Sequence, residues 1–350
     1  MKILAFETSC DDTSIALFEN ENIVHMSTRS QIKIHNKTWG VVPEVASREH
    51  ANSIFDVLDE IFDVSKISLW EIDYIAVTTH PWLIPSLLTW ITVASTISQV
   101  LQIPIIPIDH IEAHIFSNWI ERVESEIRFP LVCLTVSWWH NEIWYMKNMF
   151  LKEKLWQTQD DAAGEAYDKV AKMMWLSYPG GPVISKLANE YISEKENIIE
   201  SKKNTQLFPR VFLEKSEFNF SFSGLKSAVR REIEKRKNAS NTLTTLDLSD
   251  RQEISYEFQE AINEVLAYKI IQAAKFKQVS TILLAGWVSA NDNLNEKIKK
   301  QSYMYWYNFF APTKKIYCMD NAAMIGILAY YKIKYKNFNI KMWSVTIGEK

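Results

Sequence analysis

Short apolar runs alternate with longer amphipathic stretches along the chain, and this alternation predicts an α/β protein. Runs of five or six apolar residues bounded by polar ones are typical of buried strands, whereas apolar positions repeated every three or four residues indicate helices. Up to about residue 120, the pattern predicts the series βββαβα. The expected strands are 2–6, 13–18, 23–27, 74–78 and 103–108, and the expected helices are 43–62, 86–101 and 110–120.

A similar series starts again at about residue 129. Its expected strands are 129–136, 142–146, 150–157, 281–285 and 307–310; helices start near 162 and 182 and span 225–235, 251–277, 291–302 and 321–331, with irregular stretches at 190–220 and 236–250. Two α/β halves with a cleft between them are the simplest architecture. We therefore expect an N-terminal half at 1–128, a C-terminal half with a helical insertion at 129–331, and a tail at 332–350.

Composition places the chain among ordinary soluble proteins, with 47% hydrophobic and 23% charged residues. A net charge of −3 shows no general excess of positive charge that would attract nucleic acid. An RNA contact would therefore need a local basic patch or a partner protein. Three widely spaced cysteines, Cys10, Cys133 and Cys318, favour a reduced, cytoplasmic chain. The N-terminus becomes polar too early for a signal peptide, and no uninterrupted apolar run reaches about 18 residues, so we expect no membrane contact.

Two histidines follow the strand expected at 103–108. His110 and His114 are four residues apart, which places both imidazoles on one face of a helix and suits two ligands of one metal ion. A pair of ordinary surface or core histidines would have the same spacing. A zincin-type protease is excluded, because Glu112 lies midway between the histidines and not directly after the first one.

A metal held by two histidines needs further ligands, and a carboxylate is the expected third. Asp320 lies directly before a predicted helix. It could supply that carboxylate, or it could serve as the N-cap of the helix, a position that Asp fills well.

Several polar loops join strands to strands or to helices. Singly, each is as well explained as an ordinary turn or helix start as by ligand binding. These loops are Glu7-Thr8-Ser9-Cys10-Asp11-Asp12-Thr13, Val136-Ser137-Trp138-Trp139-His140, Asp160 to Lys169, Tyr178-Pro179-Gly180-Gly181-Pro182, Phe220 to Lys226, and Ala285 to Asn291.

Together with Val41 to Arg48, His110 to His114 and Asp320 to Met324, these segments occur in the order typical of one family. The chain resembles the tRNA N6-adenosine threonylcarbamoyltransferases of the bacterial TsaD type, formerly called glycoproteases, across residues 1–330. The resemblance implies a two-domain actin-like ATPase fold, shared with sugar kinases and heat-shock chaperones, with a cleft between two RNase H-like halves.

The resemblance also implies an activity. The threonylcarbamoyl group would pass from threonylcarbamoyl-adenylate to N6 of the adenosine adjacent to the anticodon, in tRNAs that read codons starting with A. Because the attacking nitrogen belongs to the RNA base, no nucleophilic side chain is needed, and the sequence does not identify a general base. The implied partners are tRNA, the adenylate, a paralogous TsaB-like subunit and a TsaE-like ATPase.

The family's site residues map onto this chain one by one. His110, His114 and Asp320 match its metal ligands, which implies one divalent ion per chain, iron in preference to zinc. The residues that match its substrate-binding positions are Thr135, Val136, Ser137, Trp138, Trp139, Asp168, Gly181 and Asn291. Further candidates for the cleft are Glu7, Ser9, Asp11, Asp12, His140, Ser185 and Ser223.

Tryptophan replaces glycine at many of the family's positions. The chain has 13 Trp and only 8 Gly, whereas average usage would give roughly 25 Gly. Trp occupies family Gly positions at residues 39, 82, 90, 138, 139, 156, 175 and 287, with 306 as a ninth. Our hypothesis is that the source reads UGA as glycine while the written sequence translates UGA as Trp.

Three alternatives to the enzyme remain. If the Trp residues are real, the chain is an inactive or repurposed paralogue, because indoles would fill the phosphate-binding loops. The family's non-catalytic partner subunit shares the fold but lacks the metal triad. A sugar kinase would need an Asp base for phosphoryl transfer, and no sugar-kinase motif is found.

Overall fold

The computed structural model describes residues 1–201, 206–211, 219–239, 246–336, 341–342 and 344–348. Parts of the stretches predicted at 190–220, 236–250 and 332–350 lie outside these residues. The chain forms two compact units, one of residues 1–127 with 312–350 and one of residues 128–311. Each unit has a sheet of its own.

Unit 1 is built on a six-stranded sheet with the order β11-β5-β4-β1-β2-β3. Its strands are β1 (Lys2–Glu7), β2 (Asp12–Glu19), β3 (Asn22–Ser30), β4 (Tyr74–His80), β5 (Pro104–Asp109) and β11 (Lys341–Met342). Strands β1, β4 and β5 run parallel, whereas β2, β3 and β11 pair antiparallel to their neighbours. The short strand β11 places part of the predicted tail at the edge of this sheet.

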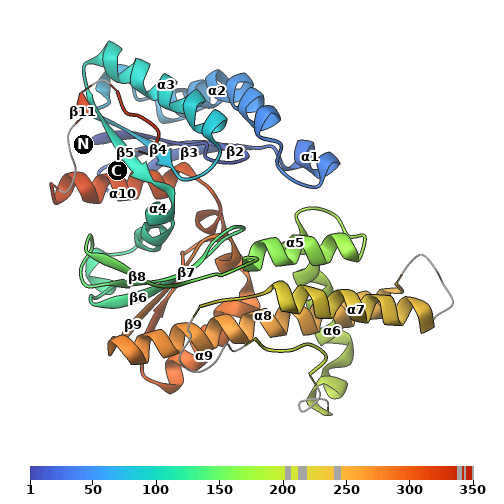
Figure 1. Ribbon diagram of the computed structural model, residues 1–350. Helices are drawn as coiled ribbons and strands as arrows, with labels where there is room; N and C mark the ends of the chain where they lie inside the picture. The colour runs from blue at the N-terminus through green and yellow to red at the C-terminus, as the bar shows by residue number, and fades with distance from the viewer. Residues whose placement is uncertain (202–205, 212–218, 240–245, 337–340, 343, 349–350) are drawn as a thin grey trace. The chain divides into compact units, whose positions relative to one another are not determined.

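Helices cover both faces of the sheet in unit 1 (Figure 1). They are α1 (Ile32–His35), α2 (Pro43–Ser65), α3 (Ile84–Leu101), α4 (His110–Phe116) and α10 (Ala322–Lys334). Successive side chains of β1 point to opposite faces of the sheet, and this explains the layers. Leu4 and Phe6 join the core beneath α2 and α3, while α10 packs on β1 and β2 from the opposite face. On that face, Gly326 lets α10 approach the ring of Phe18.

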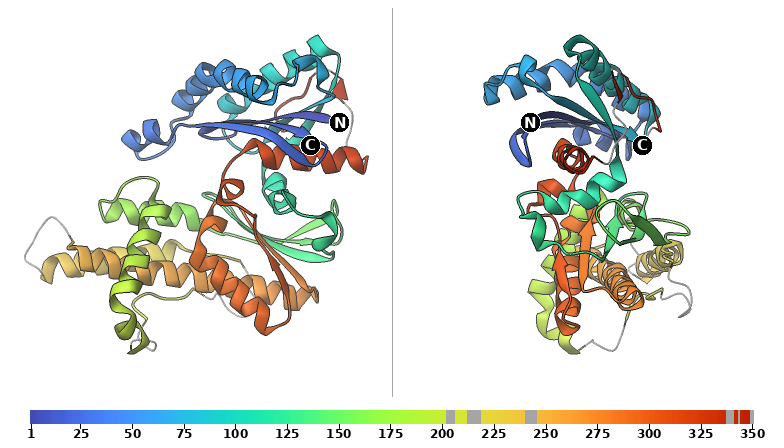
Figure 2. Two further views of the ribbon diagram at one scale, coloured as in Figure 1. Left: turned by 180° about the vertical axis from the view of Figure 1, so that it is seen from behind. Right: turned by 90° about the vertical axis from the view of Figure 1, so that its left-hand side faces the viewer.

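Unit 2 repeats the arrangement with a five-stranded sheet of order β10-β9-β6-β7-β8 (Figure 2). Its strands are β6 (Leu131–Val136), β7 (Asn141–Met146), β8 (Lys152–Gln157), β9 (Thr281–Ala285) and β10 (Asn308–Phe310). Its helices are α5 (Ala163–Met173), α6 (Gly180–Ser201), α7 (Ser223–Ala239), α8 (Leu248–Lys277) and α9 (Asp292–Met304). Both sheets thus contain an antiparallel three-stranded meander extended by parallel strands, as the repeated βββαβα series predicted.

Two expectations from the sequence differ from the structure. The helix expected at 321–331 was assigned to the C-terminal half, but α10 belongs to unit 1, because its apolar residues pack on β1 and β2. Residues 190–201 were expected to be irregular, but they continue α6. Ile184, Leu187 and Tyr191 are buried along that helix, which packs against α8.

One helix, α3, is long and apolar enough to cross a membrane by length and composition alone. About a third of the 18-residue window is buried inside unit 1, where Leu87, Ile91 and Ala94 join the core between the helix and the sheet. Because a core helix passes the same test, this is weak evidence for a membrane span.

Candidate metal centre and ligand-binding loops

The two histidines of the candidate metal centre lie in unit 1, in the short helix α4, and the N-cap of that helix fixes where they begin. Strand β5 ends at Asp109, whose Oδ1 accepts a hydrogen bond from the backbone N–H of Glu112 at 2.9 Å and so caps α4. The helix begins at His110, and His114 follows one turn later on the same face. Both imidazoles are about 1% exposed.

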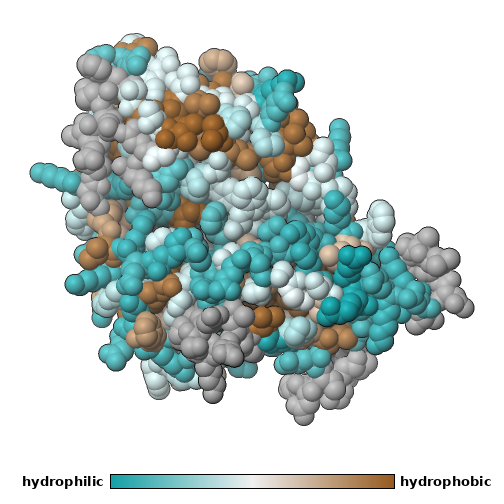
Figure 3. Space-filling view, in the orientation of Figure 1, coloured by the Kyte–Doolittle hydropathy of each residue, from teal (hydrophilic) through white to brown (hydrophobic). Residues whose placement is uncertain are grey.

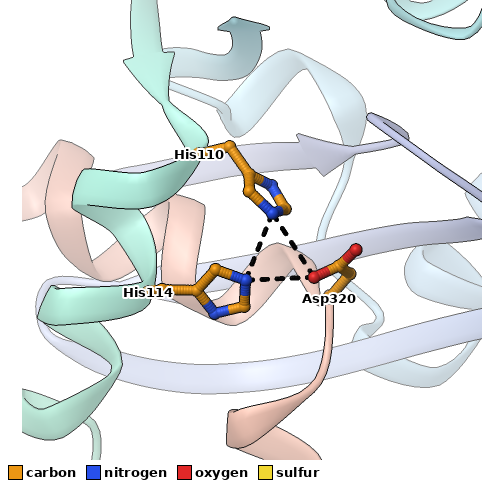
Figure 4. A group of neighbouring side chains, drawn as sticks. All are labelled: His110, His114 and Asp320. Atoms are coloured by element: carbon orange, nitrogen blue, oxygen red, sulfur yellow. Dashed lines mark hydrogen bonds and ion pairs between the residues drawn. The ribbon is translucent and has the colours of Figure 1, made fainter. Parts of the chain in front are cut away.

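Asp320 comes from the segment before α10, 206 residues further along the chain than His114. The N-cap of α10 is Asn321, whose side chain accepts from the N–H of Met324 at 3.1 Å. The N-cap role considered for Asp320 is therefore wrong. Because Asn321 caps the helix, the Asp320 carboxylate turns toward the two imidazoles (Figure 4).

Three ligand atoms converge in this centre. The Nε2 atoms of His110 and His114 are 3.1 Å apart, and the Oδ1 of Asp320 lies 3.0 Å from the His114 Nε2 and 3.4 Å from the His110 Nε2. Two ligands bound ~2.1 Å from one ion are ~3.0 Å apart at octahedral angles and ~3.4 Å apart at tetrahedral angles. The triad therefore fits a single divalent ion.

Glu7 and Ser9 lie behind His110. The Nδ1 of His110 is 3.1 Å from the Oε2 of Glu7 and 3.0 Å from the Oγ of Ser9. Glu7 is fully buried and is held by Thr78 Oγ1 at 2.6 Å and by the N–H of Ser9 at 2.6 Å. A carboxylate on Nδ1 fixes the tautomer of a metal-ligating histidine, so this contact directs the lone pair of Nε2 toward the centre.

Charge in the centre suits a cation. Burial by itself would lower the pKa of His110, but the carboxylates of Glu7 and Asp320 outweigh it and raise that pKa to about 10. Burial would raise the pKa of Asp320, yet His110 and His114 hold it well below its usual range. Burial lowers the pKa of His114. At neutral pH Asp320 is therefore a carboxylate and His114 is neutral, while His110 must release a proton when an ion binds.

Two further acids follow in the turn between β1 and β2. Asp11 and Asp12 are both buried, and burial together with the charge of Asp11 raises the pKa of Asp12 to about 8. The neighbouring thiol of Cys10 has a raised pKa for the same reasons, burial first and then Asp11. A cation bound nearby would stabilise the ionised forms of these acidic groups and lower their pKa values.

The loops of unit 2 are held together mainly by backbone contacts. Residues 137–140 form a tight turn in which the N–H of Ser137 donates to the carbonyl of His140 at 2.7 Å. The first N–H groups of α5 then donate to this turn, Gly164 to Ser137 at 3.3 Å and Glu165 to Trp138 at 3.1 Å.

Glycine is required at two of these contacts. A Cβ on Gly164 would lie 2.8 Å from the Cα of Trp138, and a Cβ on Gly286, whose φ is +85°, would lie 2.5 Å from the carbonyl oxygen of Val136. Both neighbours are backbone atoms, so an added side chain could enter only by moving a loop. These turns are therefore built for close approach of main chain.

Asp168 joins two of the predicted loops. Its Oδ1 accepts from the N–H of Gly180 at 2.6 Å, at the start of α6, and its Oδ2 accepts from the indole N–H of Trp138 at 2.5 Å. Burial raises the pKa of Asp168 to about 6. Gly181 follows in α6, and no heavy atom of the described chain lies near the position of its missing Cβ.

Asn291 and Ser185 meet in a second polar group. The Nδ2 of Asn291 donates to the Oγ of Ser185 at 3.0 Å and to the Oε1 of Gln259 at 2.9 Å, and its Oδ1 caps α9 at Leu294. Asn263 donates to the Asn291 Oδ1 at 3.3 Å. Gln259 and Asn263, both on α8, were missed from the sequence because helical spacing alone marks them only as positions on a buried face.

Ser223 belongs to a third group. Its Oγ donates to the Oδ2 of Asp160 at 2.7 Å, and the same carboxylate accepts from the N–H of Phe222 at 2.8 Å. Asp160 was noted only as part of an acidic helix start. Of the remaining candidates, Thr135 donates to the carbonyl of Glu142 at 3.3 Å, Val136 is buried, and the N–H of His140 donates to Ser137 Oγ at 3.1 Å.

Comparisons with known proteins show the fold and the family of the chain. At the level of fold, the activator of 2-hydroxyisocaproyl-CoA dehydratase from Clostridium difficile matches with a TM-score of 0.50 and 12% identity, covering 96% of this chain and 97% of that one. The (R)-2-hydroxyglutaryl-CoA dehydratase component A of Acidaminococcus fermentans matches with a TM-score of 0.52 and 10% identity, covering 95% and 99%. The class is thus a protein of the actin-like ATPase fold with a candidate His-His-Asp metal centre.

Sequence comparison identifies the family. A profile described as TsaD, tRNA N6-adenosine threonylcarbamoyltransferase, matches residues 22–327. A protein of that name from Persephonella marina is 40% identical over 338 residues, covering 95% of this chain and 91% of the relative; one from Staphylococcus aureus is 38% identical over 337 residues, covering 96% and 93%. The chain therefore belongs to the TsaD family, whose enzymes form threonylcarbamoyladenosine in tRNA.

Proposed function

We propose that the chain transfers the threonylcarbamoyl group from threonylcarbamoyl-adenylate to N6 of the adenosine adjacent to the anticodon, in tRNAs that read codons starting with A. The observation that carries this proposal is the convergence of three ligand atoms from His110, His114 and Asp320 in a chain of the TsaD family. The family's partner subunit, by the expectation above, lacks such a triad.

His110, His114 and Asp320 would hold one divalent ion, iron in preference to zinc. When bound, the ion would act as a Lewis acid toward oxygens of the carbamoyl or phosphate group. Glu7 and Ser9 keep the Nε2 of His110 aimed at the centre, and the low pKa of Asp320 keeps it ionised. No side chain is assigned as nucleophile, because the exocyclic nitrogen of the adenine is the attacking atom.

Residues of unit 2 would bind the substrates. Thr135, Val136, Ser137, Trp138, Trp139, Asp168, Gly181 and Asn291 are the proposed binding positions, with His140, Ser185 and Ser223 as further candidates. The support lies in the loops themselves: helix starts at α5 and α6 and glycine-dependent turns at residues 164 and 286 are typical of main chain that binds a phosphate or a nucleotide.

The proposed protein partners are a paralogous TsaB-like subunit and a TsaE-like ATPase. Unit 1 offers an apolar surface for one of them on α2 and α3, where Phe55 is 72% and Leu88 is 49% exposed (Figure 3). Exposed apolar patches on single chains are typical of protein interfaces. The three free cysteines favour a cytoplasmic location.

One observation favours a second function, that of an inactive paralogue. The indole N–H of Trp138 donates a hydrogen bond to the Oδ2 of Asp168. The indole ring stacks on that of Trp139, with centroids 5.3 Å apart. With indoles in this loop, a substrate phosphate could not approach the main chain. The choice between the two functions therefore depends on the true identity of these residues.

Reconstitution tests the proposal. Metal-loaded chain, a TsaB-like and a TsaE-like protein and threonylcarbamoyl-adenylate are incubated with an unmodified tRNA that reads an A-starting codon, and nucleosides are quantified by mass spectrometry. We expect threonylcarbamoyladenosine at the position next to the anticodon, and its loss with the double variant His110→Ala/His114→Ala. Equal product from that variant, or none from a chain with glycine in place of Trp at the family's Gly positions, would contradict the proposal.

A further inference from the structure

Four tryptophans have backbone conformations that L-residues with large side chains rarely adopt. The φ angles are +55° at Trp39, +57° at Trp175, +60° at Trp306 and +105° at Trp82. Residues other than glycine adopt positive φ only in a few per cent of cases, mostly Asn and Asp, because the Cβ clashes with the main chain. Of the 13 tryptophans, 12 lie in the described residues, Trp343 being outside them, so a third of those described have this conformation.

The other positive-φ residues show what is normal at such positions. Lys66, Gln102 and Gln278 end α2, α3 and α8 in the left-handed region, and each has a flexible, polar side chain. Trp82 differs from all of them, since its φ of +105° lies beyond the small left-handed well that such residues use. In the described chain, Gly286 with φ +85° and Gly348 with φ +80° are its nearest equivalents.

The other eight described tryptophans have no positive φ. Trp119 behaves as a core residue: it is 1% exposed and packs on Phe116, with ring centroids 5.2 Å apart. Trp90 is likewise fully buried, on α3, and packs on Phe6 with ring centroids 5.2 Å apart. Burial and packing therefore do not separate these two tryptophans, whereas positive φ sets the first four apart.

Trp138 and Trp139 lie in a turn that packs against α5 through its main chain. The main chain of Trp138 lies where a Cβ on Gly164 would clash, so this turn is made for backbone contact. Its own side chain nevertheless extends from the turn to Asp168. The adjacent Trp139 is 49% exposed, and its ring stacks on that of Trp138.

We propose that the working polypeptide carries glycine at residues 39, 82, 175 and 306, where φ is positive. We extend the same reading to the family's other Gly positions, 90, 138, 139, 156 and 287, and keep tryptophan at 70, 119 and 144. The codon written as Trp at the nine positions is then one that the source translates as glycine. Glycine removes the strain at positive φ and leaves residues 138 and 139 as bare main chain.

This replacement defines the chemistry of the loop in unit 2. Without the indole of residue 138, the Oδ2 of Asp168 loses its donor and can accept a hydrogen bond from a ligand, while the N–H groups of residues 138 and 139 become accessible to an anionic one. This consequence rests on the proposed function and names its ligand class, an adenylate phosphate with donor groups nearby. The identity of the nine residues does not depend on that function.

Peptide mass spectrometry of the protein purified from its natural source tests the residue identities directly. We expect glycine at the nine positions and tryptophan at residues 70, 119 and 144, with UGA at the nine codons and UGG at the three. Tryptophan at residues 39, 82, 175 and 306 would overturn the proposal. Because this measurement involves no catalysis, it stands whether or not the chain modifies tRNA.

Recombinant chains test the structural reasoning separately. In a host with the standard code, one gene encodes the written sequence and a second encodes glycine at the nine positions. We expect the glycine chain to be monodisperse with a higher melting temperature, and Trp82→Gly alone to raise the melting temperature of the written chain. As the matched control, Trp119→Gly should lower it. A written chain as stable as the nine-glycine chain would show that the backbone argument is wrong.

Discussion

The metal centre of unit 1 and the loops of unit 2 are built in opposite ways. The centre consists of side chains: three ligand atoms converge within 4.8 Å of one another, and buried partners orient them. The loops consist of main chain, and their contacts depend on side chains that are absent, at Gly164 and Gly286. A centre of the first kind is destroyed by removing a ligand, whereas a loop of the second kind is destroyed by adding a Cβ.

This difference explains why the written sequence affects the two regions unequally. No tryptophan is a ligand of the metal triad, and the triad is fully assembled. In the loops, by contrast, two of the proposed binding positions are tryptophans, and one of them, Trp138, donates a hydrogen bond to the carboxylate of Asp168. Four experiments sharpen or break this comparison.

Removing ligands from the centre has the largest expected effect. In the double variant His110→Ala/His114→Ala, only the carboxylate of Asp320 remains, so bound metal should fall from about one ion per chain to almost none. Elemental analysis after dialysis against a chelator-treated buffer measures this. His25→Ala, on strand β3, is the control and should keep its metal; stoichiometric metal in the double variant would place the ion elsewhere.

Altering the partner behind His110 should have a smaller but clear effect. In Glu7→Gln the amide keeps the shape of the side chain but no longer provides a carboxylate to the Nδ1 of His110. Metal affinity should fall by about 10- to 100-fold, as is typical when such a partner is lost. Competition with a chromophoric chelator measures the affinity. The exposed substitution Glu44→Gln is the control, and an unchanged affinity in Glu7→Gln would remove Glu7 from the centre.

Adding a Cβ to the loops should destabilise unit 2. Gly286→Ala places a methyl group 2.5 Å from the carbonyl of Val136 at a φ of +85°, so we expect a loss of about 1–3 kcal/mol in the free energy of unfolding. Gly224→Ala is the matched control, because no heavy atom of the described chain lies within 4 Å of its added Cβ and the residue is helical. It should be neutral or more stable by up to ~1 kcal/mol. Chemical denaturation measures the free energy of unfolding of both variants. Equal values would mean that the loop can move to accommodate the added methyl group at little cost.

The smallest expected effect is the pH dependence that Asp168 contributes. Burial raises its folded-state pKa to about 6, above its unfolded value, so folding favours the protonated form. The stabilising contribution is therefore complete below the unfolded pKa and is lost as the pH rises through about 6. Because the side chain is only half-buried, we expect about 1 kcal/mol.

Removing the indole N–H that donates to Asp168 should enlarge this dependence. That hydrogen bond lowers the pKa of Asp168, so in Trp138→Gly the pKa should rise further above the usual value for Asp. Unfolding free energies at pH 4 to 8 for this variant and for the written chain, with Asp168→Asn as the reference, measure the difference. An identical pH profile for the two chains would show that the indole does not control the carboxylate.

Much of the fold could be predicted, because periodicity is a local property. The strands at residues 2–7 and 131–136 and the long helix α8 follow directly from apolar runs and helical spacing. The pair His110 and His114 was visible for the same reason, since four residues make one helical turn. The continuation of α6 through residues 190–201 was missed because polar residues predominate in that stretch and obscure the helical pattern.

The sequence by itself determined the order of strands and helices, the family, and the two histidines, because each of these is encoded in neighbouring residues or in ordered motifs. Only the tertiary structure decided that α10 belongs to unit 1, that Asn321 caps that helix so that Asp320 can face the histidines, and that Glu7 lies against His110 from 103 residues away. Only the backbone angles showed which tryptophans occupy conformations suited to glycine. The physical reason is that contacts across a core and the φ of a turn depend on how whole elements pack, and that packing is not encoded in any short stretch of residues.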